Sequence, residues 1–133
     1  MISGGCLCGR VRYESDGRAL FSVICHCRDC QKVSGSCGVP VMGVTMATFK
    51  VSGEPKSFSA VGSGGQPAVR FFCPECGSLL FGHPGSMPEV VTIYVGSLDA
   101  PDLFKPSAAM FTRDRPHWGR IGYDLAEHET TPQ

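Results

Sequence analysis

The sequence has no excess of charge of either sign. Its 133 residues include 12 lysines and arginines and 12 aspartates and glutamates, and no basic run stands out. Proteins that bind nucleic acid need a basic face for the phosphates, so we expect no nucleic acid partner. The length fits one domain that can bury a real core.

Long apolar runs are also absent. No run of eighteen apolar residues occurs, and no charged-then-apolar leader stands at the amino end. A membrane-spanning helix needs about 20 apolar residues, and a secretory signal needs an apolar core behind a charged start. The sequence therefore predicts neither a membrane span nor secretion, and we expect a reducing cytoplasm in which cysteines stay free.

A third absence is that of internal repeats, linkers and long amphipathic helices. Short valine- and threonine-rich segments between glycine and proline clusters are typical of strands. We expect a single domain over residues 1–123, all-β or β-dominated, and a polar carboxyl-terminal tail over 124–133. One helix is expected at 28–34, with Gly35 as its stop. The predicted strands lie near 11–13, 20–24, 39–44, 48–51, 57–61, 68–72, 79–81, 90–95, 108–112 and 118–123.

Cysteine, by contrast, is abundant, with eight residues. Cys25, Cys27 and Cys30 crowd three thiols into six positions. The gaps are too short for easy disulfides, whereas three thiolates can converge on one zinc ion. Three protein ligands are typical of a catalytic zinc with an open fourth position. Cys37 or, less readily, His26 could instead close the shell, and a role without metal is a further alternative.

A second set combines Cys6 and Cys8 with Cys73 and Cys76. The later pair has the Cys-x-x-Cys-Gly spacing of a zinc knuckle between two strands, and it lacks two ligands that the earlier pair can supply. The pairing closes a loop of 64 intervening residues. A metal at this junction offsets the entropy lost on closing the loop, which predicts a structural zinc.

The remaining candidate residues lie outside these two sets. Cys37 is expected to be a small buried hydrophobe, and Trp118 a core residue rather than a pocket wall. His83 and His128 are expected on the surface. Either Arg28 or Lys32 could offset the negative charge of three thiolates.

The motifs together resemble the glutathione-dependent formaldehyde-activating enzyme family, which includes centromere protein V. The matching segments cover most of residues 3–122 in the right order. They are Gly5-Cys6-Leu7-Cys8-Gly9-Arg10-Val11-Arg12-Tyr13, Cys25-His26-Cys27-Arg28-Asp29-Cys30-Gln31-Lys32-Val33-Ser34-Gly35-Ser36, Phe72-Cys73-Pro74-Glu75-Cys76-Gly77-Ser78 and Tyr94-Val95-Gly96-Ser97-Leu98-Asp99.

The resemblance implies packed antiparallel sheets of the Mss4-like or β-tent type, with two zinc ions per chain. It also implies a zinc-dependent carbon–sulfur lyase that acts on a thiol–aldehyde adduct such as S-hydroxymethylglutathione, with glutathione as the thiol partner. The chain departs from the family pattern at Ala109-Met110-Phe111, where members often carry a histidine.

Two other functions stay open at this point. One is a non-catalytic zinc-stabilised binding module of the same fold. The other is a redox enzyme similar to methionine sulfoxide reductase, with Cys37 as its nucleophile. The sequence does not determine the oligomeric state.

Overall fold

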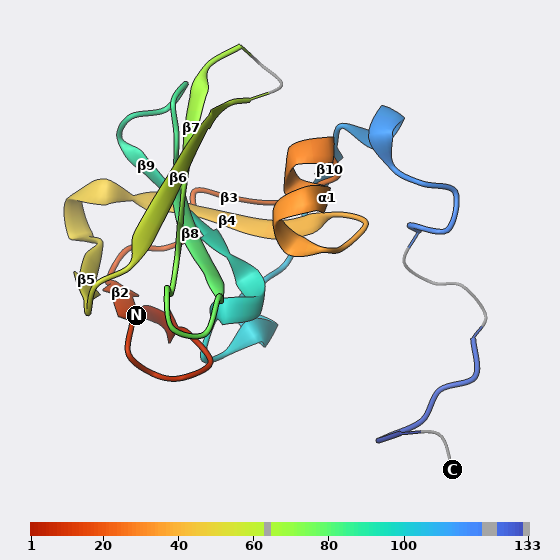
Figure 1. Ribbon diagram of the computed structural model, residues 1–133, viewed down its shortest axis with the longest axis horizontal. Helices are drawn as coiled ribbons and strands as arrows, with labels where there is room; N and C mark the ends of the chain where they lie inside the picture. The colour runs from red at the N-terminus through yellow and green to blue at the C-terminus, as the bar shows by residue number, and fades with distance from the viewer. Residues whose placement is uncertain (63–64, 121–124, 132–133) are drawn as a thin grey trace.

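The short β-prone segments form two sheets in the computed structural model, which describes residues 1–62, 65–120 and 125–131. The large sheet has the order β10-β3-β4-β9-β8-β7-β6, and the small sheet has the order β1-β2-β5 (Figure 1). The strand bounds are β1 Ile2–Gly5, β2 Arg12–Ser15, β3 Phe21–Cys25, β4 Val39–Thr45, β5 Lys50–Ser52, β6 Lys56–Val61, β7 Pro67–Phe72, β8 Leu79–Pro84, β9 Val90–Tyr94 and β10 Ala108–Met110.

Among the described residues, helical structure is confined to short segments that lie between strands or follow the last one. The α-helix α1 spans Arg28–Ser34, as the sequence predicts, and the 3₁₀ turns are η1 Met46–Thr48, η2 Val95–Ser97, η3 Pro101–Leu103 and η4 Thr112–Asp114. The predicted β-dominated fold of packed sheets is therefore confirmed. Among the described residues, no helix is long and apolar enough to cross a bilayer.

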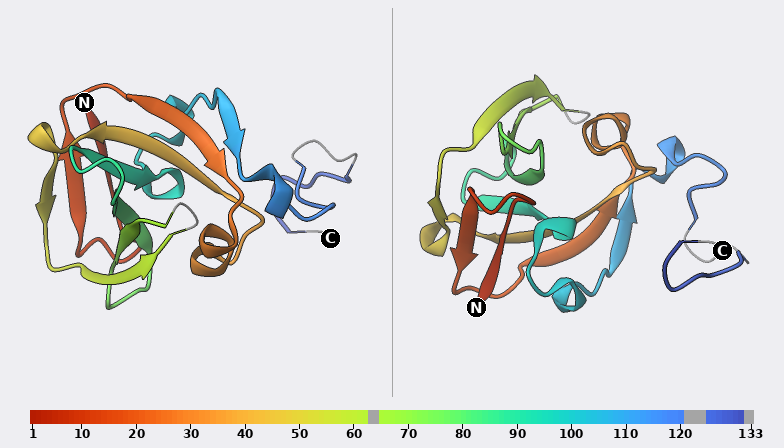
Figure 2. Two further views of the ribbon diagram at one scale, coloured as in Figure 1. Left: turned by 90° about the horizontal axis from the view of Figure 1, so that it is seen from above. Right: turned by 60° about the horizontal axis from the view of Figure 1, so that its bottom comes forward.

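The main core lies between the two sheets. The Tyr13 ring stacks on Phe49 at 5.6 Å between centroids, and Phe81 meets both rings edge-on. Strand β9 lies between β4 and β8 and is buried over most of its length, as its continuous apolar run predicts. In Figure 2, the small sheet lies at the end of the molecule opposite the carboxyl-terminal segment.

A second apolar cluster surrounds the cysteines that follow β3. It comprises Val23, Cys25, Cys27, Cys30, Val39, Val41 and Tyr94. Strand β10 extends the large sheet beside it and pairs with β3 in parallel, with Met110 opposite Cys25. This is the one parallel pair among the described strands, whereas the sequence predicts antiparallel sheets.

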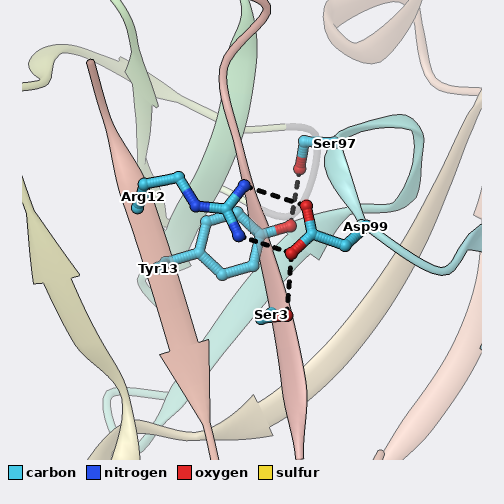
Figure 3. A network of polar contacts seen from close by, with 5 residues as sticks. All are labelled: Ser3, Arg12, Tyr13, Ser97 and Asp99. Atoms are coloured by element: carbon cyan, nitrogen blue, oxygen red, sulfur yellow. Dashed lines mark hydrogen bonds and ion pairs between the residues drawn. The ribbon is translucent and has the colours of Figure 1, made fainter. Parts of the chain in front are cut away.

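A polar network attaches the small sheet to the turn after β9 (Figure 3). Arg12 donates two hydrogen bonds to Asp99, one of them 2.9 Å long, and the Ser3 hydroxyl donates to the same carboxylate at 2.8 Å. The hydroxyls of Tyr13 and Ser97 lie 2.7 Å apart. These motif residues therefore hold the two sheets together and lie outside the cysteine clusters.

Three details of the sequence prediction are wrong. The strand expected at 48–51 begins two residues later, because η1 takes Met46–Thr48. The strand expected at 118–123 is absent over 118–120, and 121–123 lie outside the described residues. Trp118 is 57% exposed and is not a core residue. Residues 125–131 are exposed and lack helix or strand, and the division at residue 123 stays a prediction.

Candidate metal centres

The four predicted structural ligands come together although 64 residues separate Cys8 from Cys73. All four sulfurs lie within 4.8 Å of one another. The Cys6 and Cys8 sulfurs are 3.5 Å apart, and those of Cys8 and Cys73 are 3.7 Å apart. Tetrahedral sulfurs at about 2.3 Å from a zinc ion would lie about 3.8 Å from each other. The arrangement thus fits a four-thiolate zinc.

Backbone turns orient these thiols. Gly77 has a φ of 77°, which glycine adopts without steric cost, and its N–H donates to the Cys73 carbonyl at 2.8 Å. The Val11 N–H donates to the Cys6 sulfur at 3.2 Å. Hydrogen bonds from Ser78 lower the pKa of the Cys76 thiol to about 5, which favours the thiolate that a metal requires.

The second cluster lies where β3 leads into α1. Cys25 ends β3, Cys27 is the N-cap of α1 and Cys30 lies in its first turn. The Cys27 sulfur accepts a hydrogen bond from the Cys30 N–H at 3.4 Å, and Gly35 ends the helix in the left-handed conformation. The three thiols are buried and their sulfurs lie within 4.8 Å of one another.

A hydrogen bond between two of the thiols shifts their pKa values in opposite directions. The hydrogen bond from the Cys30 thiol lowers the pKa of Cys25 to about 6, and the same contact raises the pKa of Cys30. The three sulfurs lie within 4.8 Å of one another, which is close enough to bind one cation.

His26 and Cys37 do not join the cluster. The His26 ring Nδ1 lies 2.8 Å from the Cys37 carbonyl oxygen, to which it donates, and the imidazole is buried. The Cys37 thiol is half-buried and donates to the Gly119 carbonyl at 3.7 Å. Among the described residues, neither the His26 ring nor the Cys37 sulfur lies close enough to all three thiols to be a fourth ligand.

Gln31 is a structural anchor that sequence reasoning missed. It is 8% exposed, and its amide donates to the carbonyls of His26 at 2.7 Å and Asp114 at 2.9 Å. Its carbonyl accepts from Arg28. The sequence signal for Gln31 was a polar residue on the helix face that turns toward the cysteines. A buried amide there needs hydrogen-bond partners for both its nitrogen and its oxygen.

The three-thiol cluster opens onto a cavity of about 330 Å³. Most of the lining is apolar, from Phe21, Val41, Ala68, Val69, Pro84, Met87, Met110 and Phe111. The volume is at the lower end of the range for small-molecule sites. Tyr94 also lines it, and burial raises the pKa of its phenol to about 12, so the hydroxyl keeps its proton near neutral pH.

The charge beside the cluster comes from Arg70, contrary to the expectation for Arg28 or Lys32. Both of those residues are exposed, whereas Arg70 is buried, lines the cavity and interacts electrostatically with Cys30. No sequence motif marks Arg70, because its approach to Cys30 depends on the pairing of distant strands.

The prediction that His83 lies on the surface is also wrong. It lines the cavity, its ring packs edge-on against Phe71 at 5.1 Å, and its Nδ1 is buried without a hydrogen-bond partner among the described residues. Burial lowers the pKa of this imidazole. His128 is exposed, as expected.

The end of β10 and the residue after it form part of the cavity wall. Met110 and Phe111 both line the cavity. Phe111 has φ 53° and ψ 42°, a left-handed conformation that is rare for a bulky side chain. Residues held in such conformations cluster at functional sites. Met110 and Phe111 give this part of the cavity an apolar wall.

Comparisons with known proteins identify the family of this chain. The family model for the glutathione-dependent formaldehyde-activating enzyme matches residues 1–114. A crystal structure of a Rhodobacter sphaeroides protein is similar with a TM-score of 0.62 and 20% identity, covering 81% of this chain and 99% of that one, which supports the fold. No curated protein matches the sequence. The chain therefore belongs to the glutathione-dependent formaldehyde-activating enzyme family.

Proposed function

We infer that this protein is a zinc-dependent carbon–sulfur lyase that makes or breaks a thiol–aldehyde adduct. The observation that carries the inference is the position of Cys25, Cys27 and Cys30, three buried thiols that open onto an apolar cavity. The family description names glutathione and formaldehyde, so S-hydroxymethylglutathione is the first substrate to test. Cys6, Cys8, Cys73 and Cys76 would hold a structural zinc.

The residues of the second cluster fit a catalytic zinc. A zinc ion bound there would supply an electrophile that lowers the pKa of a thiol or polarises an oxygen. Cys25, Cys27 and Cys30 would hold it through three thiolates, and a ligand from the cavity would be its fourth. A divalent ion with three thiolates has a net charge of 2 − 3 = −1, so the site favours thiol exchange over hydrolysis.

Cleavage of the adduct balances without an oxidant. The hydroxyl proton leaves the adduct, the carbon–oxygen double bond forms, and the electron pair of the carbon–sulfur bond goes to sulfur, which then takes up a proton. The apolar walls exclude water from this exchange, and the protonated Tyr94 hydroxyl is available as a hydrogen-bond donor in the same cavity.

The free thiols bear on the compartment and the partner of the protein. The eight cysteines are free in the structure, which fits a reducing compartment, and we place the protein in the cytoplasm. A small thiol is its partner, and the balanced charge gives no basis for a nucleic acid partner.

The test is exchange of formaldehyde and glutathione with S-hydroxymethylglutathione, followed by NMR at equilibrium. Zinc-loaded protein should accelerate exchange over the buffer rate, and Cys27→Ser should not. A Cys37→Ser variant is the matched control, because Cys37 lies outside the cluster. Wild-type protein that binds zinc and leaves the exchange rate unchanged would favour the non-catalytic binding module instead.

A further inference from the structure

Arg70 occupies an unusual position in the floor of the cavity. It lies on β7, where it pairs with Gly82 of β8, and Gly82 in turn pairs with Thr92 of β9. Its side chain is 8% exposed, and it lines the cavity that adjoins the Cys25–Cys30 cluster. A buried guanidinium is costly unless it is paired, so its partners are informative.

Those partners are incomplete. The Arg70 Nε is buried without a hydrogen-bond partner, and the ion pairs among the described residues are Arg10–Glu75 and Arg12–Asp99. Arg70 interacts electrostatically with Tyr94, Cys30 and Asp29, yet none of the carboxylates of the described segments lies within ion-pair distance. A guanidinium carries five N–H donors, more than one sulfur and one phenol can satisfy.

The strand position that pairs with Arg70 is closely packed. A Cβ at Gly82 would lie 2.7 Å from the Val69 carbonyl oxygen and 3.3 Å from both the Tyr94 hydroxyl and the Thr92 hydroxyl. Glycine at this position therefore lets β8 approach the Val69 carbonyl and the hydroxyls of Thr92 and Tyr94. Arg70 is the single lysine or arginine of the described lining, and Asp29, which interacts with it electrostatically, is the one carboxylate. The cavity therefore offers one guanidinium and one carboxylate within mainly apolar walls.

We propose that Arg70 forms an anion-binding subsite beside the Cys25–Cys30 cluster, and that the substrate carries one carboxylate-type group within its reach. The proposal rests on the proposed function, since it places the carboxylate on the thiol–aldehyde adduct. A planar guanidinium binds a carboxylate through two parallel hydrogen bonds, and the low polarity around it strengthens them. The apolar walls accept the uncharged remainder of the molecule.

The positive charge of Arg70 also neutralises the nearby thiolates. If that were its whole role, replacing Arg70 would have a different effect on thiol binding. If Arg70 only offsets the cluster, its loss weakens metal binding and affects every thiol alike. If it also binds an anion, its loss affects thiols that carry a carboxylate and spares neutral ones. The experiment therefore compares thiols and does not depend on turnover.

Cobalt-substituted protein, in which the visible absorption of the metal reports thiol binding, is titrated with mercaptoacetate and with 2-mercaptoethanol. Wild-type protein should bind mercaptoacetate at least about tenfold more tightly, the ratio that one hydrogen bond to a charged group supplies. Arg70→Met should reduce that ratio to near one, and Arg70→Lys should leave an intermediate ratio, because lysine keeps the charge without the fork. Arg18→Met, at an exposed site, should keep the wild-type ratio.

Glutathione is titrated in parallel, since it too carries carboxylates. Affinity that matches mercaptoacetate and falls in Arg70→Met would identify glutathione as the source of the anion, and weaker affinity would identify a small thiol acid. A wild-type ratio near one overturns the proposal even if Arg70→Met fails to fold. A high ratio retained in Arg70→Met also overturns it, because the metal alone would then hold the carboxylate. Protein that binds neither thiol overturns the proposed function as well, which separates the two failures.

Discussion

The amide of Gln31 donates to the backbone carbonyl of Asp114 at 2.9 Å, although 83 positions separate the two residues. This contact attaches α1, which carries Cys30, to the segment that follows β10. The same amide holds the His26 carbonyl next to the cluster. The geometry of the three thiols therefore depends on a side chain that need not touch a metal.

Replacing Gln31 by alanine should loosen this attachment. The His26 and Asp114 carbonyls would lose their donor in a buried setting, which costs about 1–3 kcal/mol. We expect a lower urea midpoint and faster tryptic cleavage at Arg113. Gln66→Ala, at an exposed position, is the control. Equal midpoints for the two variants would show that the Gln31 contacts contribute nothing to stability.

Two zinc ions per chain are expected from the division of seven cysteines into sets of four and three. Elemental analysis of protein purified without chelator should give a value close to two. A reproducible value near one after zinc supplementation would remove the second site.

The two sets should differ in what their loss does to the fold. A structural zinc in a small domain supplies roughly 10–16 kcal/mol of apparent binding energy, comparable with the total stability of about 5–15 kcal/mol. Cys76→Ser should therefore give unfolded or insoluble protein. Cys27→Ser should fold, keep one zinc and lose exchange activity, because its cluster closes only short loops. Circular dichroism and zinc content are measured on both variants. If Cys76→Ser folds normally and Cys27→Ser does not, the structural and catalytic roles of the two sets are reversed.

Cys37→Ser should keep both metals and most of the stability. The Cys37 sulfur contacts the Gly119 carbonyl and stands apart from the three clustered thiols, so a hydroxyl can take its place. Zinc content and thermal midpoint should match those of the wild type. Selective loss of one zinc would identify Cys37 as a fourth ligand and end the open-site mechanism.

The Arg12–Asp99 pair predicts a pH dependence. Hydrogen bonds from Arg12 and then Ser3 lower the pKa of the Asp99 carboxyl to about 2. A lowered carboxyl pKa stabilises the fold above the unfolded value of about 3.9 and loses that effect as the pH falls toward 2. The difference in urea midpoint between wild type and Asp99→Asn should thus be constant from about pH 5 to 8.

Glu75→Gln supplies the comparison for that pair. The Glu75 carboxylate lies 3.9 Å from Arg10 with both side chains largely exposed, and such pairs contribute almost nothing. Its midpoint should equal that of the wild type over the same pH range. A difference that falls between pH 8 and 5 for Asp99→Asn would contradict the assignment of the lowered pKa to Asp99.

Local spacing in the sequence determined the strands, the helix and the two sets of thiols. Cys25, Cys27 and Cys30 are close in the chain, and a strand followed by a short helix brings their sulfurs together whatever the rest of the fold does. The Cys73–Cys76 knuckle is equally local, and the missing two ligands indicated the pair at Cys6 and Cys8. Whether these sets hold structural and catalytic zinc stays a prediction.

Tertiary structure alone decided what surrounds the thiols. Arg70 lines the cavity beside Cys30 in a sheet where β7 pairs with β8 and β8 pairs with β9, so that Arg70 lies opposite Gly82 and Gly82 opposite Thr92. Met110 lies beside Cys25 because β10 adds to β3 in parallel. No local pattern encodes such neighbours, since they depend on strand order across the whole sheet. Sequence spacing therefore indicated which residues form the metal sites, and strand pairing determined the cavity onto which one of them opens.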